Sequence, residues 1–169
     1  GDAKHRANVI GPMCPRDVIL FDDFLGIALD TTNDWNAALP GSNDTIAINA
    51  AVGGHVRLTT GTVITNSLML SSAVTWEADK KAMCEARIRL NDVDQTALFF
   101  GFSDEIAEIT SAMAIAYTSN ALTTTADNAT GFVMDPSATT LGGTSLLCCG
   151  VKANTDATTV DSGVNWGAD

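Results

Sequence analysis

Carboxylates are the side chains of this sequence most able to do chemistry, because several of them occur in close pairs. Calcium takes about six to eight oxygen ligands from carboxylates and carbonyls, and loops at the edge of a sheet can supply them. No pair is followed by the complete spacing of a calcium-binding loop, so we interpret them as solvated turn residues. We expect no bound cofactor, and calcium at Asp92 and Asp94 is the alternative to test first. The pairs are Asp22 with Asp23, Asp92 with Asp94, and Asp104 with Glu105.

Glu105 and Glu108 invite comparison with the paired carboxylates of glycosidases. A retaining glycosidase holds its two carboxyl groups about 5 to 5.5 Å apart across the substrate. The spacing here places the two glutamates on opposite faces of a strand, or side by side on an exposed helix. No further acid stands where it could orient them. We therefore predict no catalytic residues and expect that the protein is not an enzyme.

The two histidines, His5 and His55, lack the neighbours that a catalytic or metal site requires. A serine hydrolase would have to use His55, and no Gly-x-Ser-x-Gly turn accompanies it. A zinc site would need a Cys-x-x-Cys pair or a second nearby ligand. The glycine pairs at 53–54 and 142–143 lack the spacing of a nucleotide-binding loop. These patterns favour structural or surface roles.

The cysteines also lack metal-ligand spacing. Cys148 and Cys149 are adjacent on an expected strand, so they should point to opposite faces and are poorly placed to bond each other. We interpret all the cysteines as buried free thiols of a protein made in a reducing cytoplasm. The other two are Cys14 and Cys84.

Tryptophan rings are the surfaces on which a sugar could stack, so Trp35 and Trp76 are the candidate glycan-binding residues. The alternative places each ring in a core or at a subunit interface. Trp166 lies in a polar context that resembles the approach to another strand. We therefore expect that the native chain continues past Asp169, or that a partner chain completes the sheet.

The charge balance argues against two classes of partner. The 169 residues carry 20 acidic and 9 basic side chains, which gives a net charge of −11. Nucleic acids and anionic membranes both attract Lys and Arg, so we expect neither as a direct partner. Charged residues make up 17% of the chain, below the roughly 25% of an ordinary globular protein. Such a sparsely charged surface is typical of a protein that buries much of itself in an assembly.

Many short alternating segments, separated by Gly, Asn and Pro turns, predict an all-β antiparallel sandwich. The clearest segment is Ala82–Leu90, in which apolar residues at even positions alternate with Met83 and three charged residues at odd positions. A turn at 91–95 and the apolar run Thr96–Phe102 predict that it forms a hairpin. Further strands are expected at Val18–Phe24, Thr45–Asn49, His55–Gly61, Ser67–Leu70, Gly131–Met134, Ser145–Val151 and Thr158–Ser162.

At most one short helix is expected, after a potential N-cap at Ser103. Ile106, Ile109, Met113 and Ala116 recur there at helical spacing. The acidic residues that follow Ser103 would favour the start of such a helix.

Residues Gly1–Asp17 are expected to form an extended N-terminal arm, because they contain two prolines, three basic residues and no apolar periodicity. Lys4, Arg6 and Arg16 are the candidate interface residues of this arm, since they can pair with acidic groups of a neighbour. Residues 18–169 then form one sandwich domain, which we expect to be incomplete at its C-terminus.

One further observation is an ordered set of segments: Phe21–Gly26, Trp35, Gly53–Gly61, Cys84–Leu90 and Leu98–Asp104. This set resembles the concanavalin A-like lectin/glucanase jelly roll, and more narrowly the versions of that fold found in virion proteins of tailed bacteriophages. The resemblance covers about residues 18–169. It implies a jelly-roll β-sandwich in which the Glu-Ala-Arg-Ile-Arg-Leu segment pairs with Phe-Phe-Gly-Phe. The glycosidase branch carries a Glu-x-Asp-x-x-Glu motif that this sequence lacks, so the resemblance does not imply hydrolysis.

The resemblance implies a non-enzymatic virion structural protein, and we predict a capsid decoration (cement) protein. It would be made in the host bacterial cytoplasm and would lie on the outer capsid surface. Its partners would be the major capsid protein and copies of itself, as a homodimer or homotrimer. The alternative is a lectin-like module on a head or tail fibre that binds host-surface glycan. An exposed Trp35 or Trp76 beside ordered acidic loops would favour the alternative.

Overall fold

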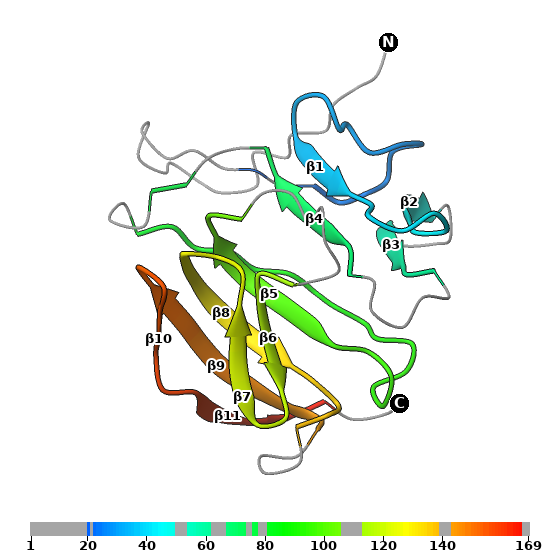
Figure 1. Ribbon diagram of the computed structural model, residues 1–169. Coiled ribbons are helices and arrows are strands. Elements are labelled where there is room, and N and C mark those ends of the chain that lie inside the picture. Colours follow the sequence, from blue (N-terminus) through cyan, green and yellow to red (C-terminus); the bar gives the residue numbers. More distant parts are fainter. Residues whose placement is uncertain are drawn as a thin grey trace.

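The computed structural model describes residues 20, 22–49, 54–61, 67–73, 76–77, 81–105, 113–138 and 143–166. These residues form strands, turns and loops but no helix, and every strand pair among them is antiparallel (Figure 1). The predicted all-β fold is therefore confirmed. The strands are β1 (Trp35–Ala38), β2 (Thr45–Asn49), β3 (His55–Thr59), β4 (Met69–Ser72), β5 (Leu98–Ser103), β6 (Ile115–Thr118), β7 (Ala121–Thr124), β8 (Asn128–Met134), β9 (Ser145–Lys152), β10 (Thr155–Asp156) and β11 (Val160–Asn165).

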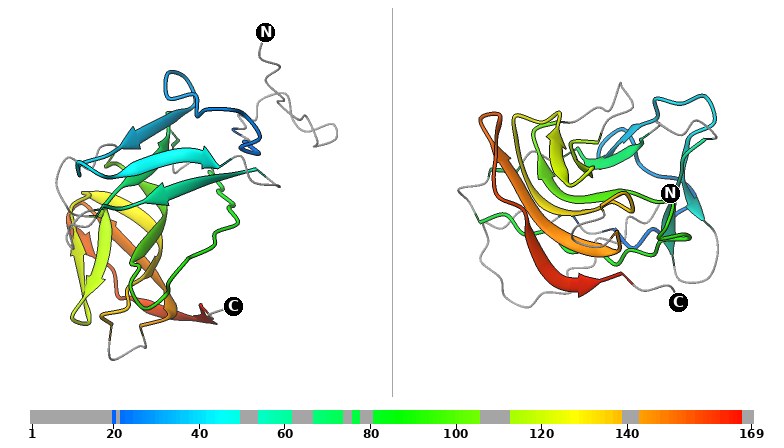
Figure 2. Two further views of the ribbon diagram at one scale, coloured as in Figure 1. Left: turned by 90° about the vertical axis from the view of Figure 1, so that its right-hand side faces the viewer. Right: turned by 60° about the horizontal axis from the view of Figure 1, so that its bottom comes forward.

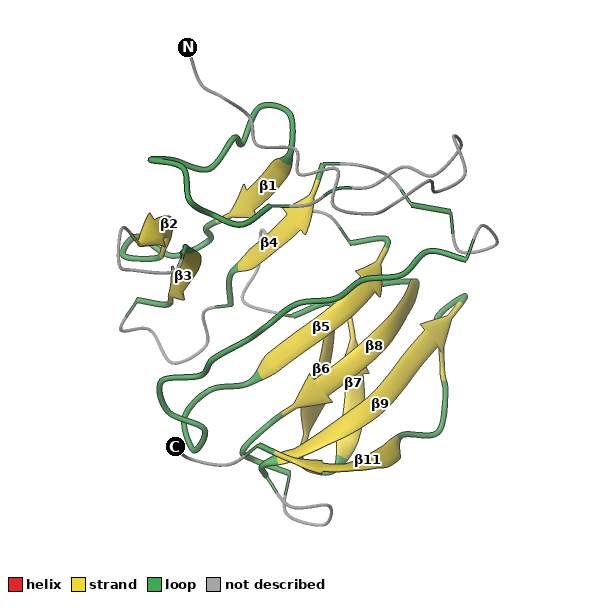
Figure 3. Ribbon diagram, turned by 180° about the vertical axis from the view of Figure 1, so that it is seen from behind, coloured by secondary structure: helices red, strands yellow, loops and turns green. Residues whose placement is uncertain are grey.

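The largest sheet is built around β9. One edge of β9 pairs with β8, which pairs in turn with β5, and the other edge pairs with β10 and β11 (Figure 3). Buried and half-buried residues alternate along β9. Cys149 therefore points into the core and Cys148 to the opposite face, which confirms the prediction for these adjacent cysteines.

The hydrophobic core lies between this sheet and the β6–β7 hairpin, which crosses one face of the sheet (Figure 1). Ile115 and Tyr117 of β6 belong to one cluster with Val133 of β8 and Leu147 of β9, and Phe99 of β5 packs against it. Full burial of an apolar side chain of this size contributes about 1.5–3 kcal/mol relative to exposure. The sheet and the hairpin are thus the two packed layers of a sandwich.

A pair of facing glycines lets β5 and β8 approach closely. Gly101 is the register partner of Gly131. A Cβ on Gly101 would overlap the carbonyl oxygen of Thr130, and a Cβ on Gly131 would overlap that of Phe100. Only glycine, which has no Cβ, fits at these two positions.

The N-terminal region, which we define as the described residues of 20–77, contains two separate two-stranded sheets, β1–β4 and β2–β3. Figures 1 and 3 both place it on the β5 side of the main sheet. The predicted strand Thr45–Asn49 is confirmed as β2, and the run from His55 forms β3. Asp44 is the only side chain of this region that is buried among its described residues, so no buried apolar core lies here.

The prediction that Ala82–Leu90 forms a hairpin with Thr96–Phe102 is wrong for the first of these two segments. The second segment forms β5, but β5 pairs with β8. Residues 82–90 are extended and pair with no strand among the described residues. The left view of Figure 2 shows this green stretch standing away from the sheets. The alternation of apolar and polar residues determines which side chains share a face of a strand. It does not determine which other strand the backbone pairs with.

The predicted strand Val18–Phe24 is wrong over its described residues at 22–24, which form turns. The carboxylates of Asp22 and Asp23 accept hydrogen bonds from the backbone N–H groups of Phe24 and Leu25. Phe24 has a φ of 51°, which is incompatible with a strand. Two turn-forming aspartates therefore override the β-rich composition of this run.

The prediction of a short helix after Ser103 is also wrong at its C-terminal end. Ala116, the last residue at helical spacing, lies in strand β6 (Ile115–Thr118). Ser103 accepts a hydrogen bond from the N–H of Glu105 through its Oγ at 3.0 Å, as an N-cap would. Residues 106–112, which include most of the proposed helix and Glu108, lie outside the described residues.

Candidate functional site

Both candidate glycan-binding tryptophans lie at one end of the β1–β4 pair. Trp35 is the register partner of Ser72, and the Oγ of Ser72 accepts a hydrogen bond from the indole N–H of Trp76 at 2.9 Å. The indole N–H of Trp35 donates to Asp22 Oδ2 at 2.8 Å. Its ring centroid lies 5.6 Å from that of Phe24, with 39° between the planes. We name Asp22, Phe24, Trp35, Ser72 and Trp76 the tryptophan cluster.

The tryptophan cluster presents aromatic surface but no unengaged indole donor. Both tryptophans are half-buried, so neither is a fully exposed platform. The loop before β1 is ordered by Asp30, whose Oδ1 accepts hydrogen bonds from the N–H groups of Thr32 and Asn33. Sugar stacking on these half-buried rings stays a prediction.

Asp44 is a buried carboxylate that joins a turn to a strand end. Its Oδ2 accepts the N–H of Gly41 at 2.7 Å, and its Oδ1 accepts the N–H of Gly61 at 2.6 Å. Charge-assisted hydrogen bonds of this length are among the stronger kinds in proteins. Asp44 thus fastens the turn before β2 to the chain that leaves β3, and its role is structural.

Asp92 and Asp94, the metal candidates, lie in an exposed turn after the extended stretch. Asp92 Oδ1 accepts the N–H of Asp94 at 3.0 Å, which is the hydrogen bond of an ordinary aspartate turn. Within the described residues, no group of three or more His, Cys, Asp or Glu could hold a metal ion. The geometry at this pair is therefore that of a turn, and calcium binding stays a prediction.

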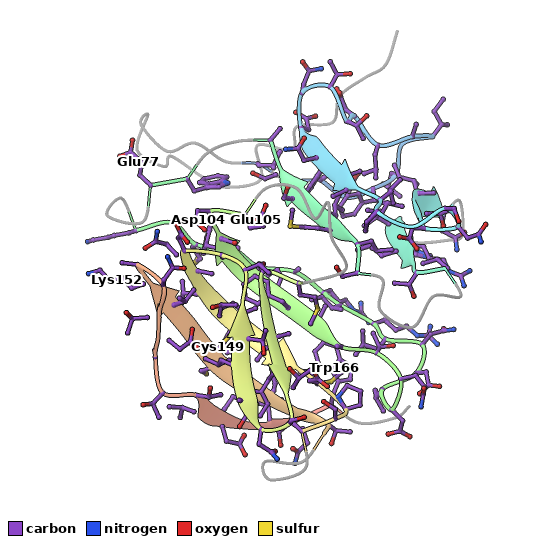
Figure 4. The ribbon with its side chains drawn as sticks, viewed as in Figure 1. Glu77, Asp104, Glu105, Cys149, Lys152 and Trp166 are labelled. Carbon is purple, nitrogen blue, oxygen red and sulfur yellow. The ribbon has the colours of Figure 1, made fainter. Side chains whose placement is uncertain are left out.

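Asp104 and Asn128 connect three strands at one end of the main sheet. Figure 4 labels Asp104 there, at the same end of the sheet as Lys152. Asp104 Oδ2 accepts hydrogen bonds from both the backbone N–H and the side-chain amide of Asn128, each at 3.0 Å. Asn128 Oδ1 accepts the N–H of Ala153, in the turn between β9 and β10. Desolvation raises the pKa of Asp104, but the hydrogen bonds that its carboxylate accepts from Asn128 and from the backbone at 104 and 127 outweigh it, so the pKa is lowered overall. This corner holds three strand ends together.

The thiols differ in exposure. Cys149 is buried, and its Sγ donates to the carbonyl of Gly131 at 3.5 Å. Burial, with the neighbouring Cys148 adding to it, raises the pKa of Cys149 to about 11. Cys84 is exposed, although partial burial still raises its pKa, so the prediction that every thiol is buried is wrong for Cys84. Cys14 lies outside the described residues.

The interface candidates Lys4, Arg6 and Arg16 also lie outside the described residues, together with His5. His55 is exposed at the start of β3, as its position after two glycines suggested. Sequence reasoning missed Asp44 and the Asp104–Asn128 corner, because their partners are distant backbone groups. The Pro40–Asp44 turn residues gave the only local signal for Asp44.

Large exposed apolar side chains occur in the N-terminal region, and also at Met83, Phe132, Val160 and Val164. Ile27 is 99% exposed and Leu25 is 67% exposed. Leu39 and Leu58 of the same region are also exposed. Groups of exposed apolar residues are typical of interaction surfaces, whereas single ones are ordinary.

Comparisons with models of known protein families, with curated proteins and with solved structures find no match. Within the described residues, no helix has the length and hydropathy that a membrane crossing requires. The family suggested by the sequence therefore stays a prediction.

Proposed function

We propose that the protein is a non-enzymatic structural protein of a bacteriophage virion, and that it decorates the outer capsid surface and stabilises the head. The observation that carries this proposal is the uneven burial of apolar residues. The C-terminal strands have their own core, although Val160 and Val164 of β11 are exposed. The N-terminal region has no buried apolar side chain among its described residues and exposes Leu25, Ile27, Leu39 and Leu58. An assembly partner would cover such side chains, and the resemblance to phage virion jelly rolls suggests the major capsid protein.

In this mechanism the main sheet and its hairpin act as a preformed body. The exposed apolar residues of the N-terminal region are then buried across the joint between capsid subunits, which makes the subunits harder to separate. Burial of about 25 cal/mol per Å² of apolar surface is the driving term. Lys4, Arg6 and Arg16 of the arm would add pairs with acidic groups on a neighbouring subunit.

The test is co-sedimentation of the full chain with expanded capsids that lack decoration protein. Ile27→Asp places a charge in the proposed interface, and we expect it to weaken binding by about tenfold or more. Thr158→Asp is the matched control, because Thr158 is exposed in the loop before β11. Failure of the wild-type chain to bind, or equal binding by both variants, would contradict the proposal.

A lectin-like glycan-binding module is the second candidate, and the tryptophan cluster is the observation that favours it. The full chain would be screened against bacterial surface polysaccharides, with Trp76→Ala compared with Trp166→Ala. Binding that is lost only in the Trp76 variant would favour this function. The engagement of both indole N–H groups is the reason that we place it second.

A further inference from the structure

The extended stretch Ala82–Leu90 is a strand in sequence and conformation but has no strand partner among the described residues. Met83 is 85% exposed, and residues 83–87 are all exposed. A long unpaired strand presents a row of backbone donors and acceptors to which another strand can bind. The question is which strand would bind there.

The charge pattern of the stretch fits a second copy of itself. When two copies pair antiparallel about Ala86, Glu85 of each faces Arg87 of the other, on one side of the ribbon. Opposite charges directly across a strand pair are favourable, and like charges are unfavourable. Symmetry makes this contact twice, as in any interface with a twofold axis.

Neighbouring registers that keep the two faces separate are less favourable, because each opposes like charges or leaves charges without an opposite partner. Pairing about Glu85 places that carboxylate opposite its own copy. Pairing about Arg87 faces Glu85 with Arg89 twice, but it also places the two Arg87 guanidinium groups opposite each other. Pairing about Ile88 places Arg87 opposite Arg89. Pairing about Cys84 faces Glu85 with Met83 and leaves Arg87 without an acidic partner. The register about Ala86 therefore pairs the charges best.

The other side of the ribbon is apolar in the same register. Cys84 faces Ile88, and Ala82 faces Leu90. Ile88 and Leu90 are half-buried against their own chain. This matters because an isolated two-stranded ribbon is only marginally stable in water, whereas one with a packed face gains support.

We propose that Ala82–Leu90 is a self-complementary strand through which two copies of this chain form a twofold dimer. This inference rests on the proposed function and deepens it by naming the surface for the self-association that the sequence predicts. It can be tested on the isolated chain, so capsid binding and dimerisation can fail independently.

The decisive experiment measures the mass of the full chain by sedimentation equilibrium, for wild type, Glu85→Arg, Arg87→Glu and an equal mixture of the two variants. Each variant alone opposes like charges twice, and we expect its dimer dissociation constant to rise by about tenfold or more. The mixture restores opposite charges at both contacts, so dimers should return. No loss of folding in a single variant could produce that recovery.

A second measurement checks the register by disulfide formation. In a Cys84→Ser background, Ala86→Cys places two thiols on the twofold axis, where directly opposed strand residues lie close enough to bond. Ile88→Cys in the same background is the control, because its partner would then be serine. A monomeric wild type, unchanged mass in both charge variants, or a mixture that stays monomeric would overturn the proposal. Protection of residues 82–90 in a monomer would instead support the hairpin with β5, which carries no charge over Leu98–Phe102.

Discussion

The two halves of the molecule hold their shape by different means. The strands from β5 onward enclose apolar side chains, and Ile115, Val133, Met134 and Leu147 are almost completely buried. In the N-terminal region, carboxylates accept hydrogen bonds at turns and strand ends, and the only buried side chain of its described part is Asp44. Hydrogen bonds fix geometry but add little net stability, about 0.5–1.5 kcal/mol each. The comparison teaches that apolar packing shapes one half, whereas side-chain hydrogen bonds at turns and strand ends shape the other.

The largest effect should come from truncating the core. Leu147→Ala leaves a cavity between β9 and the β6–β7 hairpin and should lower the free energy of unfolding by about 2–5 kcal/mol. Leu58→Ala, in the N-terminal region, removes the same atoms from an exposed site. It should change the free energy of unfolding by about 0.5 kcal/mol or less. Urea denaturation measures both. Equal losses would show that the two halves share one core.

The glycine pair should give the next largest effect. Gly101→Ala forces β5 and β8 apart, and we expect a loss of about 1–3 kcal/mol in unfolding free energy. Gly150→Ala is the matched control in the same sheet, since its Cβ would approach no closer than 3.4 Å, to the carbonyl of Ala129. Thermal unfolding of the two variants decides the point. Equal melting temperatures would mean that β5 and β8 do not need this close approach.

Asp44→Asn should loosen the N-terminal region alone. An amide nitrogen cannot accept the N–H of Gly41 or Gly61, so one buried donor loses its partner at a local cost of about 1–3 kcal/mol. Hydrogen exchange should become faster at those two glycines and stay unchanged in β8 and β9. Asp94→Asn, in an exposed turn, serves as the control. Faster exchange throughout the molecule would show that the halves unfold together.

The smallest effect concerns the pH dependence of the core. Because the pKa of Cys149 is about 11 in the folded chain and 9.0 is its ordinary value, the unfolded chain loses this proton first as the pH rises. Stability should therefore fall between about pH 9 and pH 11 and should not depend on this thiol below that range. Comparing pH-dependent unfolding of wild type with Cys149→Ala measures this contribution. In the folded monomer, iodoacetamide should label exposed Cys84 before buried Cys149, and the reverse order would contradict the assigned burial.

The sequence predicted the elements that depend on local patterns. Alternation was sufficient for β2 and β9, and it correctly placed Cys148 and Cys149 on opposite faces. It failed at Ala82–Leu90, because pairing depends on what the rest of the chain brings alongside. It also failed at Asp22 and Asp23, whose turn hydrogen bonds compete with strand formation.

The candidate site was predictable in its residue types but not in its geometry. Trp35 and Trp76 were identified as aromatic candidates, yet their position at one end of a strand pair depends on the pairing of β1 with β4 across more than thirty residues. The hydrogen bond between Asp22 and Trp35 spans 13 residues and has no local signature. Long-range contacts of this kind are decided by tertiary packing.

The place of the core along the chain has a consequence for synthesis on the ribosome. The N-terminal region emerges first, carrying exposed leucines and open strand edges, while the residues that bury Ile115 and Val133 are made much later. Domains generally fold as units during translation, and partly made chains with exposed apolar surface are prone to aggregate. The vulnerable interval lasts until β9 has left the exit tunnel. A chaperone, or an early contact with another nascent copy, would have most effect during that interval.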